Sequence, residues 1–553
     1  MKALALRAVQ VLCLSSLPLG ALAAGAAADP AAVLRQAIAA ACADPQAGQR
    51  RHVLPGGAAL SVTRLAPGGR LRELRAVYEA PKGGETRPEL LALAGPDCAI
   101  RYGRRLEYSS DGRPYAIRFL HADLSDSGAG ELLDAPVPAA PDPGGVALAH
   151  VDSGVNYLLP EIASRLARDA DGAALGYDWW DMDRRPFDQD PSRSAFFPQR
   201  HGTRTASLLL AEAPYARLIS YRYPRPEMSR MASLVEAAAT AGARIVVVAM
   251  GSNDRAAWES YAEAARRHPE MLFVVSAGND GRDLDREPVY PAALELANQL
   301  SVTSAEDDGS LARGSNWGRR SVDLLVPAER VLATGFDGRR IFASGSSYAA
   351  ARVGALAACL SAAHPQWRAK ALREAILAQA YPPGSESWSA HGLLPDPAIR
   401  DRGACPAVQT SVSERGSESL SSADFAPASS SGPTPSKAID LSVVAVDGSG
   451  WESPAVRAML RSAAEIFGQC GIALRNVSVH YLSAPERLRY FTAETAQALV
   501  GARAYAKPGV YLVADTRRPI AFDAEAFAPA NSAAHPLLAD TVWIMRGMRN
   551  PGI

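Results

Sequence analysis

Between residues 146 and 326, short apolar runs alternate with stretches that have helical spacing. The runs lie at residues 146–151, 216–221, 245–250, 272–276, 300–303 and 322–326. Continuous runs of Val, Ile and Leu between helices are typical of parallel strands that are covered on both faces. The pattern therefore predicts an α/β fold, in which a parallel sheet carries helices on both faces.

The region before this sheet has a different pattern. Residues 30–43 have apolar side chains at helical spacing, and the segments that follow alternate like strands. Apolar positions in residues 106–119 flank Asp111-Gly112, which indicates a hairpin. We expect a small N-terminal α+β domain over residues 24–133.

The last region predicts a separate C-terminal α/β unit over residues 438–553. Residues 439–446 and 472–481 have strand patterns, and residues 454–469 have apolar side chains at helical spacing. The chain stops soon after the apolar run 541–545. We therefore expect the fold of this unit to be incomplete.

Two stretches are predicted to be linkers. Residues 134–145 are rich in proline and glycine, which cannot continue a helix or a central strand. Residues 406–437 are rich in serine and proline and have few large apolar groups to bury. The α/β region between the two linkers then spans residues 146–405.

The length of the chain indicates the number of domains, and its charge indicates which kinds of partner to expect. A chain of 553 residues is expected to fold as several domains. It has 58 Lys and Arg and 58 Asp and Glu, and this balance gives no reason to expect a nucleic-acid or anionic-membrane partner. Any partner must therefore be sought in a local site.

The first 23 residues have the pattern of a cleaved signal peptide. Lys2 and Arg7 precede a short apolar stretch, and small residues follow at positions 21–24. The alternative, a membrane anchor, is disfavoured because the apolar stretch is short and broken by polar residues and a proline. We expect a secreted or periplasmic protein with no membrane contact after cleavage.

Export would place the cysteines in an oxidising compartment, where pairs tend to close. Without the signal segment, five cysteines are left. Cys42 with Cys98 and Cys359 with Cys405 are candidate pairs, which leaves Cys470 over. The spacing fits no zinc pattern, and connectivity does not follow from sequence alone.

Polar residues follow three of the predicted strands or begin the helices after them, which is where parallel sheets expose catalytic groups. The first motif is the strand that ends in Asp152-Ser-Gly154. A carboxylate fixed there can hold a histidine in one tautomer. By itself, however, Asp-Ser-Gly after a strand is more typical of a plain turn.

The second motif is His201-Gly-Thr, which opens an apolar helical run. A histidine held at the start of a helix is suited to general base chemistry near neutral pH. His150 lies inside the first strand, and we expect it to be structural instead.

The third motif is Ser344-Gly-Ser346-Ser347, which opens a long helix. Small residues let a substrate approach the backbone, and the helix start favours developing negative charge. Either serine can alternatively serve only as a helix cap. Between the second and third motifs, Asn279 follows the strand at 272–276, where its amide can donate to an oxyanion or form an ordinary turn.

Each motif is ambiguous alone, but their order is informative. Asp, His, Asn and Ser in this sequence resemble the subtilisin-like serine peptidase family, the subtilases of secreted bacterial type, over residues 146–381. The resemblance implies Asp152 as the orienting acid, His201 as the base, Asn279 as the oxyanion donor and Ser347 as the nucleophile. It also implies that Ala249, Met250 and Gly251 pair with the substrate main chain.

Several residues depart from the family pattern. Arg204 replaces the second histidine of His-Gly-Thr-His, Tyr348 replaces Met, and Ala351 stands where the family has proline. These changes leave the substrate preference and the helix geometry open.

Five carboxylates at residues 178–190 are candidates for structural calcium, although a solvated loop is the more frequent use of such a stretch. No metal ligand is assigned, and the chemistry is expected to need no cofactor.

The resemblance implies a serine endopeptidase that acts on proteins or peptides through an acyl-enzyme. An α/β-hydrolase esterase is excluded because Gly-x-Ser-x-Gly is missing and the serine comes last. A catalytically inactive binding module with the same fold is the alternative.

The N-terminal domain is expected to be either an intramolecular inhibitor that is later removed or a permanent binding domain. The C-terminal unit faintly resembles the front of secreted zinc metallopeptidase-like domains but lacks His-Glu-x-x-His.

Overall fold

The structure of the protein is a computed structural model. It describes residues 29–44, 50–306, 309–381, 388–400, 412–425, 435–491, 493–516 and 536–546. The predicted signal segment and Cys405 lie outside these residues. Among the helices in the described part of the chain, none is long and apolar enough to cross a membrane.

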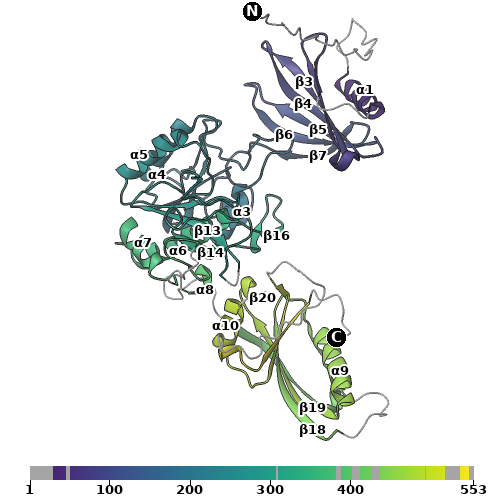
Figure 1. The fold of residues 1–553 in the computed structure, drawn as a ribbon, viewed down its shortest axis with the longest axis vertical. Helices are drawn as coiled ribbons and strands as arrows, with labels where there is room; N and C mark the ends of the chain where they lie inside the picture. The colour runs from purple at the N-terminus through teal and green to yellow at the C-terminus, as the bar shows by residue number, and fades with distance from the viewer. Residues whose placement is uncertain are drawn as a thin grey trace, which may run out of the picture. The chain divides into compact units, whose positions relative to one another are not determined.

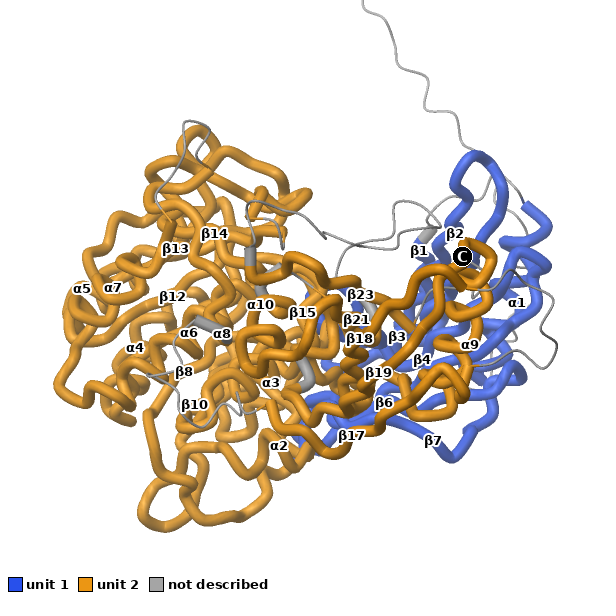
Figure 2. Tube along the Cα trace, turned by 90° about the horizontal axis from the view of Figure 1, so that it is seen from below, with its two compact units in different colours: residues 1–135, 191–198 blue, residues 136–190, 199–553 orange. Residues whose placement is uncertain are grey.

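The chain divides into two compact units, which Figure 2 colours separately. In its described residues, unit 1 consists of an antiparallel meander with one α-helix (Figure 1). In chain order its elements are α1 (Pro30–Ala43), β1 (Arg50–Val53), β2 (Ala59–Leu65), β3 (Glu73–Lys82), β4 (Glu85–Ala94), β5 (Ile100–Tyr108), β6 (Pro114–Leu120) and β7 (Asp126–Leu132). The predicted helix at 30–43 and the predicted hairpin, seen as β5 and β6, are both confirmed.

Helix α1 begins where Asp29 accepts hydrogen bonds from the amides of Ala31 and Ala32. Its apolar side packs on the sheet through Leu34 and Ile38, which are almost fully buried. A disulfide joins Cys42 at the end of this helix to Cys98, with Cα atoms 6.1 Å apart. The predicted pair is therefore confirmed.

Unit 1 also contains a second, short segment of the chain, Pro191–Pro198 (Figure 2). Phe196 is buried in this unit, in a cluster with Leu106 and Ile117. Arg104 donates to the Phe196 carbonyl at 2.9 Å and lies over the ring of Phe197. Sequence patterns gave no sign that this segment belongs with the N-terminal sheet.

Residues 136–145, most of the predicted first linker, contain no helix or strand among the described residues. The linker is nevertheless anchored within unit 2. Asp142 accepts hydrogen bonds from the amide of Arg168 and from the guanidinium of Arg217. The stretch is therefore tethered, although residues 141–145 are exposed as expected.

Unit 2 is built on the predicted parallel sheet. Its strands lie in the order β14-β13-β12-β11-β8-β10-β9, and every pair in it is parallel. They are β8 (Val146–Asp152), β9 (Tyr177–Asp178), β10 (Ala216–Arg222), β11 (Ile245–Val248), β12 (Leu272–Ser276), β13 (Gln299–Ala305) and β14 (Leu324–Pro327). All six predicted strands are present.

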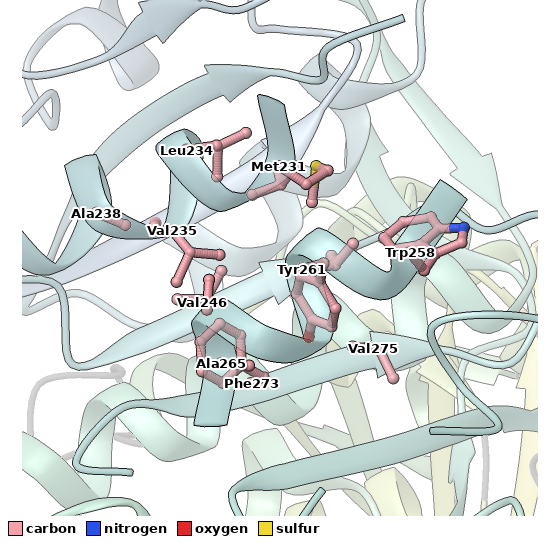
Figure 3. Packing of buried hydrophobic residues seen from close by; sticks show 14 of the residues in the cluster. Met231, Leu234, Val235, Ala238, Val246, Trp258, Tyr261, Ala265, Phe273 and Val275 are labelled. Atoms are coloured by element: carbon pink, nitrogen blue, oxygen red, sulfur yellow. The ribbon is translucent and has the colours of Figure 1, made fainter. Parts of the chain in front are cut away.

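Helices cover both faces of this sheet. On one face, α4 (Met231–Thr240) and α5 (Glu259–Arg267) enclose a large apolar core, part of which Figure 3 shows. On the other face, α6 (Ser346–Ala363) packs against β11, and α3 (Gly202–Glu212) packs against α6. Because side chains alternate along β8, Ala149 and Val151 enter the first core, whereas His150 and Asp152 point to the α3 and α6 face.

Further elements complete this part of the chain. They are α2 (Pro160–Ala163), the antiparallel pair β15 (Val331–Thr334) and β16 (Arg340–Ala343), α7 (Ala369–Leu377) and α8 (Pro397–Arg400). Cys359 lies on α6 and is disulfide-bonded. Its predicted partner, Cys405, is outside the described residues.

The C-terminal region of unit 2 has its own mainly parallel sheet, in the order β17-β19-β18-β21-β23. The strands are β17 (Ser413–Ser421), β18 (Lys437–Val446), β19 (Ile472–Ser483), β21 (Gly509–Val513) and β23 (Thr541–Met545), with α9 (Ser453–Gln469) between β18 and β19. α10 (Ala493–Ala502) and the short pair β20 (Tyr490–Phe491) and β22 (Asp515–Thr516) complete the described part. The predicted strands and helix are confirmed, and Cys470 is a free, exposed cysteine.

The predicted linker over residues 406–437 is wrong in part. Ser413–Ser421 is strand β17, which pairs antiparallel with β19. Composition suggested that this stretch has too little apolar surface to order itself. It orders because the backbone pairs with an existing sheet edge, while Leu420 and Phe425 are buried in the C-terminal core.

Candidate active site

Asp152 is the last residue of β8 and is almost completely buried, with 2% of its side chain exposed. Its carboxylate is held by the amide of Ser153, which donates to Oδ1 at 2.7 Å. The buried strand thus delivers a fixed charge to the edge of the sheet, as the sequence predicts.

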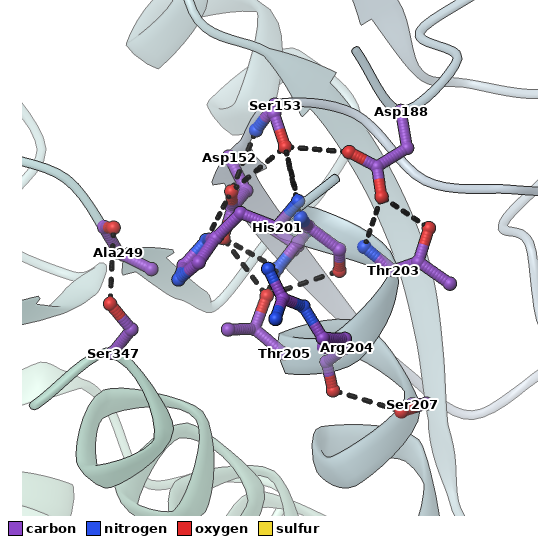
Figure 4. A network of polar contacts seen from close by, with 12 residues as sticks. Asp152, Ser153, Asp188, His201, Thr203, Arg204, Thr205, Ser207, Ala249 and Ser347 are labelled. Atoms are coloured by element: carbon purple, nitrogen blue, oxygen red, sulfur yellow. Dashed lines mark hydrogen bonds and ion pairs between the residues drawn. The ribbon is translucent and has the colours of Figure 1, made fainter. Parts of the chain in front are cut away.

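His201 stands at the residue before α3 begins, with its ring facing Asp152 (Figure 4). Its Nδ1 lies 2.7 Å from Oδ1 and 2.9 Å from Oδ2 of Asp152. The glycine after it is required by space, because a Cβ at Gly202 would lie 1.9 Å from the carbonyl oxygen of Gly154. Only glycine lets the helix start this close to the turn that follows β8.

The pair is electrostatically coupled. Burial disfavours the protonated form of His201, but the charge of Asp152 and their hydrogen bond outweigh it, so the pKa of His201 is raised. Burial likewise disfavours the Asp152 carboxylate, but His201 outweighs it and the pKa of Asp152 is lowered. A neutral His201 therefore donates its Nδ1 proton to an ionised Asp152 and keeps Nε2 as the basic nitrogen.

Ser153 and Asp188 support this pair in roles that no sequence pattern predicts. Ser153 donates to Asp188 at 2.6 Å and accepts from the amides of His201 and Gly202. The other oxygen of Asp188 accepts from the amide of Thr203 at 2.9 Å (Figure 4). The buried carboxylate of Asp188, one of the five carboxylates considered as candidates for calcium, thus caps the first turn of α3.

A second missed group reaches Asp152 from the helix. The hydroxyl of Thr205 donates to Asp152 Oδ2 at 2.9 Å, and His150 Nε2 lies 2.9 Å from the same hydroxyl. Thr205 follows His201 by four residues, which places both on one side of the helix. His150 is fully buried, as expected for a structural residue, but it belongs to the hydrogen-bond network of Asp152.

Ser347 lies in the first turn of α6, with its hydroxyl 3.5 Å from the carbonyl oxygen of Ala249. Among the described residues no hydrogen bond joins it to His201, although Figure 4 shows both in one view. In proteins without substrate such catalytic hydrogen bonds are often long or unformed. The neighbouring Ser346 is fully buried, and its hydroxyl accepts from the amide of Gly278. Ser346 is thus committed to the fold, which favours Ser347 as the reactive serine.

Asn279 follows β12 and has an exposed side chain beside the start of α6. Its Oδ1 accepts a hydrogen bond from the amide of Ser346 at 2.9 Å. Because only the oxygen of the amide can accept, this bond determines which way the group is turned. The Nδ2 donor is consequently left for another acceptor.

Ala249, Met250 and Gly251 continue the chain beyond β11, which ends at Val248 instead of at 250 as predicted. The amide of Ala249 still bonds to the carbonyl of Val151, at 3.3 Å. Ala249 is nearly buried, whereas Met250 and Gly251 are partly exposed. The segment therefore leads from the sheet to the surface next to Ser347.

The residues that depart from the family pattern also lie close by. The ring of Tyr348 is buried with its centre 6.1 Å from that of His201, and burial raises the pKa of its phenol to about 12. The positive charge of Arg204 opposes protonation of His201. Ala351 lies inside the continuous helix α6, so the chain follows a regular helical path where the family has proline.

The acidic stretch 178–190 is not the solvated loop that was expected. Asp178 and Asp181 both pair with the buried guanidinium of Arg222, and Tyr223 donates to Asp190. Burial raises the pKa of Asp178 to about 6, the charge of Arg222 acting against it. Among the described residues, no group of three or more potential ligands is placed to hold a metal ion. Protein donors thus occupy the carboxylates that were candidates for calcium.

Comparison with known proteins finds similarity to one family over the region that contains this site. The model of the subtilase family matches residues 144–392, so this part of the chain is similar to that family. A thermophilic serine proteinase of Bacillus sp. (strain AK1) is 27% identical over 231 residues, which cover 39% of this chain and 52% of that protein. Halolysin of Haloferax mediterranei is 27% identical over 201 residues, which cover 34% of this chain and 36% of that protein. The chain spans about half the length, or less, of these curated relatives.

Among solved structures, a cold-adapted subtilisin-like serine proteinase is similar with a TM-score of 0.38 and 23% identity. That match covers 48% of this chain and 93% of the other.

Proposed function

We propose that this protein is a serine endopeptidase that cleaves peptide bonds through an acyl-enzyme. The observation that carries the proposal is the contact of His201 Nδ1 with the buried Asp152, 2.7 Å away, at the edge of the sheet where α6 presents Ser347. A histidine held in this way keeps Nε2 free to take a proton. The match of residues 144–392 to the subtilase family supports the same conclusion.

The first half of the reaction follows from these roles. His201 Nε2 takes the proton of Ser347 as its oxygen bonds to the carbonyl carbon of the substrate. The resulting oxyanion accepts from Asn279 Nδ2, which the Ser346 amide keeps turned outward. His201 then passes the proton to the leaving amine as the peptide bond breaks. Asp152 stabilises the imidazolium without taking its proton.

Water completes the second half by attacking the acyl-enzyme, with His201 again accepting and returning a proton. Proteins or peptides are the substrates we propose, bound as an added strand along Ala249, Met250 and Gly251. We propose no nucleic-acid partner, because the chain has zero formal net charge. The proposed chemistry uses side chains and water alone, without a cofactor.

Replacement of the nucleophile tests this proposal. We expect Ser347→Ala to abolish hydrolysis of casein, because loss of the nucleophile costs on the order of 10⁶ in turnover in subtilisin. Ser346→Ala is the matched variant, since it removes only a hydroxyl that accepts from Gly278, and it should retain measurable activity. Casein hydrolysis that survives in Ser347→Ala would contradict the assignment.

A catalytically inactive binding module is the competing function. A fluorophosphonate probe separates the two, because it labels only a serine that an adjacent base activates. The proposed peptidase should be labelled at Ser347 in the wild-type protein and unlabelled in Ser347→Ala. A wild-type protein that resists the probe and does not cleave casein would favour the binding module.

We also propose that the protein is secreted or periplasmic and that the N-terminal domain acts as an intramolecular inhibitor until it is removed. The Cys42–Cys98 disulfide is suited to an oxidising compartment. The exposed residues 141–145 offer a site for cleavage. N-terminal sequencing of the exported protein tests both points. A start near residues 141–146 would support removal, whereas a start near residue 24 would indicate a permanent domain.

A further inference from the structure

The network behind Asp152 contains a histidine that the proposed reaction does not use. His150 and Asp152 lie two residues apart on β8, so both side chains point to the face that α3 covers. His150 has no exposed side-chain surface. Its Nε2 lies 2.9 Å from the Thr205 hydroxyl but 3.7 Å from Asp152 Oδ2, so Thr205 stands between the two.

The proton of Thr205 has two acceptors within reach. One is Asp152 Oδ2 at 2.9 Å, and the other is the carbonyl of Gly202 at 3.1 Å, three residues back in the helix. A threonine inside a helix commonly donates to such a preceding carbonyl. When Thr205 donates to Asp152, its hydroxyl oxygen is left to accept a hydrogen bond from His150 Nε2, which selects the Nε2–H tautomer of His150.

The protonation state of His150 is consistent with His150 as the donor and Thr205 as the acceptor. Burial lowers its pKa, so the ring is neutral and carries a single N–H. Its Nδ1 has no hydrogen-bond partner among the described residues, nor has the hydroxyl of Ser220, the residue paired with His150 on β10. Leaving two buried polar groups unsatisfied costs stability, and such groups in a native core call for an explanation.

We propose that Thr205 and His150 form a relay that positions the Asp152 carboxylate for His201. This inference rests on the proposed peptidase function. Because His150 donates to its oxygen, the Thr205 hydroxyl does not donate to His150, and its proton lies toward the charged carboxylate of Asp152, the nearer and stronger of its two acceptors. Oδ2 of Asp152 is thereby fixed by the Thr205 hydroxyl, while the Ser153 amide fixes Oδ1. Both residues are positioning residues, since neither touches the serine or the substrate.

The hydrogen bond from Thr205 also weakens the electrostatic effect of Asp152 on the pKa of His201. A hydrogen bond donated to a carboxylate stabilises its charged form and weakens its pull on a neighbouring proton. Removing the Thr205 donor should therefore raise the pKa of His201. Other charged or titratable groups around the pair are unchanged by this substitution; they are Asp188, Arg204, Tyr223 and Tyr348.

Kinetics of Thr205→Val test the relay, because valine keeps the shape and removes the hydroxyl. We expect kcat to fall about 10-fold to 100-fold, as for loss of a hydrogen bond to a charged group, with KM unchanged. The acidic limb of the kcat/KM profile should move to higher pH. Thr205→Ser, which restores the hydroxyl, should recover the wild-type profile. His150→Leu should cause a smaller fall, since the Thr205 hydroxyl can still donate to Asp152.

A double variant separates positioning from a merely structural role. His150→Leu combined with Thr205→Val replaces both polar partners by apolar groups, which is often close to neutral for stability. We expect its melting temperature to recover relative to Thr205→Val while kcat stays low. If kcat and the pH profile instead return to wild type as stability recovers, the relay is contradicted.

Titration of His201 by NMR keeps the relay separate from the proposed function. In Ser347→Ala, we expect Thr205→Val to raise the midpoint at which the His201 ring titrates, and Thr205→Ser to leave it unchanged. An unshifted midpoint in Thr205→Val would overturn the relay even if the peptidase is active. A wild-type protein without peptidase activity would overturn the proposed function, while the titration would still decide on the relay.

Discussion

Two parallel strands of this protein end in nearly the same sequence but in different environments. Strand β8 ends in Asp152, with Gly154 two residues on, and β18 is followed by Asp447 and Gly448. Asp152 has 2% of its side chain exposed and lies against His201. Asp447 has 40% of its side chain exposed and pairs with Arg415, itself 63% exposed. An apolar strand that ends in aspartate therefore produces a catalytic candidate only where a second element covers it.

The covering element accounts for the difference. Helix α3 begins with His201 and lays Thr205 over Asp152, and the glycine at its start permits the close approach to β8. After β18 the chain forms α9, whose buried residues Val456 and Leu460 pack into an apolar core. Asp447 is left near the surface, where an ion pair contributes little.

The sharpest test of this comparison is to neutralise each aspartate. We expect Asp152→Asn to lower kcat by about 10⁴-fold, because an amide favours the wrong tautomer of His201. Asp447→Asn is the matched control and should leave kcat unchanged. Casein cleavage measured on both purified variants decides the point. Equal losses would mean that the two strand ends are functionally alike.

The next expected effect concerns the oxyanion. Asn279→Ala should reduce kcat by about 10² to 10³, with little change in KM, because the amide acts on charge that develops in the transition state. Asn476, whose amide bonds to Asp440 on the C-terminal sheet, provides the control. Asn476→Ala should have wild-type kinetics. Comparable kinetics in both variants would contradict the role of Asn279.

The glycines after the two aspartates should differ in stability. A Cβ at Gly154 would lie 2.5 Å from the carbonyl oxygen of Phe187, which is backbone and cannot move aside. At Gly448 the nearest atoms belong to the flexible end of the Arg489 side chain. Both residues have positive φ, which costs about 1–2 kcal/mol for alanine.

We therefore expect Gly154→Ala to destabilise by about 2–5 kcal/mol, the overpacking adding to the strain, and Gly448→Ala by about 1–2 kcal/mol. Thermal unfolding in the Ser347→Ala background, which prevents self-digestion, measures both. A larger loss for Gly448→Ala would show that the turn after β8 is not closely packed.

The pH dependence of wild-type activity should show the effect of Asp152 on the pKa of His201. No histidine is paired with Asp447 among the contacts of the described residues. Because His201 must be neutral to accept a proton and Asp152 raises its pKa, kcat/KM should fall about tenfold per pH unit below a midpoint that lies above 6.5. A pH series with a peptide substrate measures the midpoint. A midpoint below 6.5 would mean that burial outweighs the charge of Asp152.

Much of the fold could be predicted because its signals are local. Apolar runs gave all six predicted strands of the main sheet, and helical spacing gave α1 and α9. Strand β17 could not be predicted, because its serines and glutamates have no strand pattern and depend on the edge of β19. The placement of Pro191–Pro198 in unit 1 also depends on a partner far away in sequence, the cluster around Leu106.

In the candidate site, too, some features follow from local sequence and others depend on the tertiary structure. The sequence by itself determined the order of Asp152, His201, Asn279 and Ser347, since each stands where a strand ends or a helix begins and can be found from its immediate neighbours. Only the tertiary structure decided which aspartate meets a histidine, which serine hydroxyl is bound by the amide of Gly278, and that Thr205 and His150 lie behind Asp152. Those outcomes depend on distances between separate elements, and local sequence does not encode such distances.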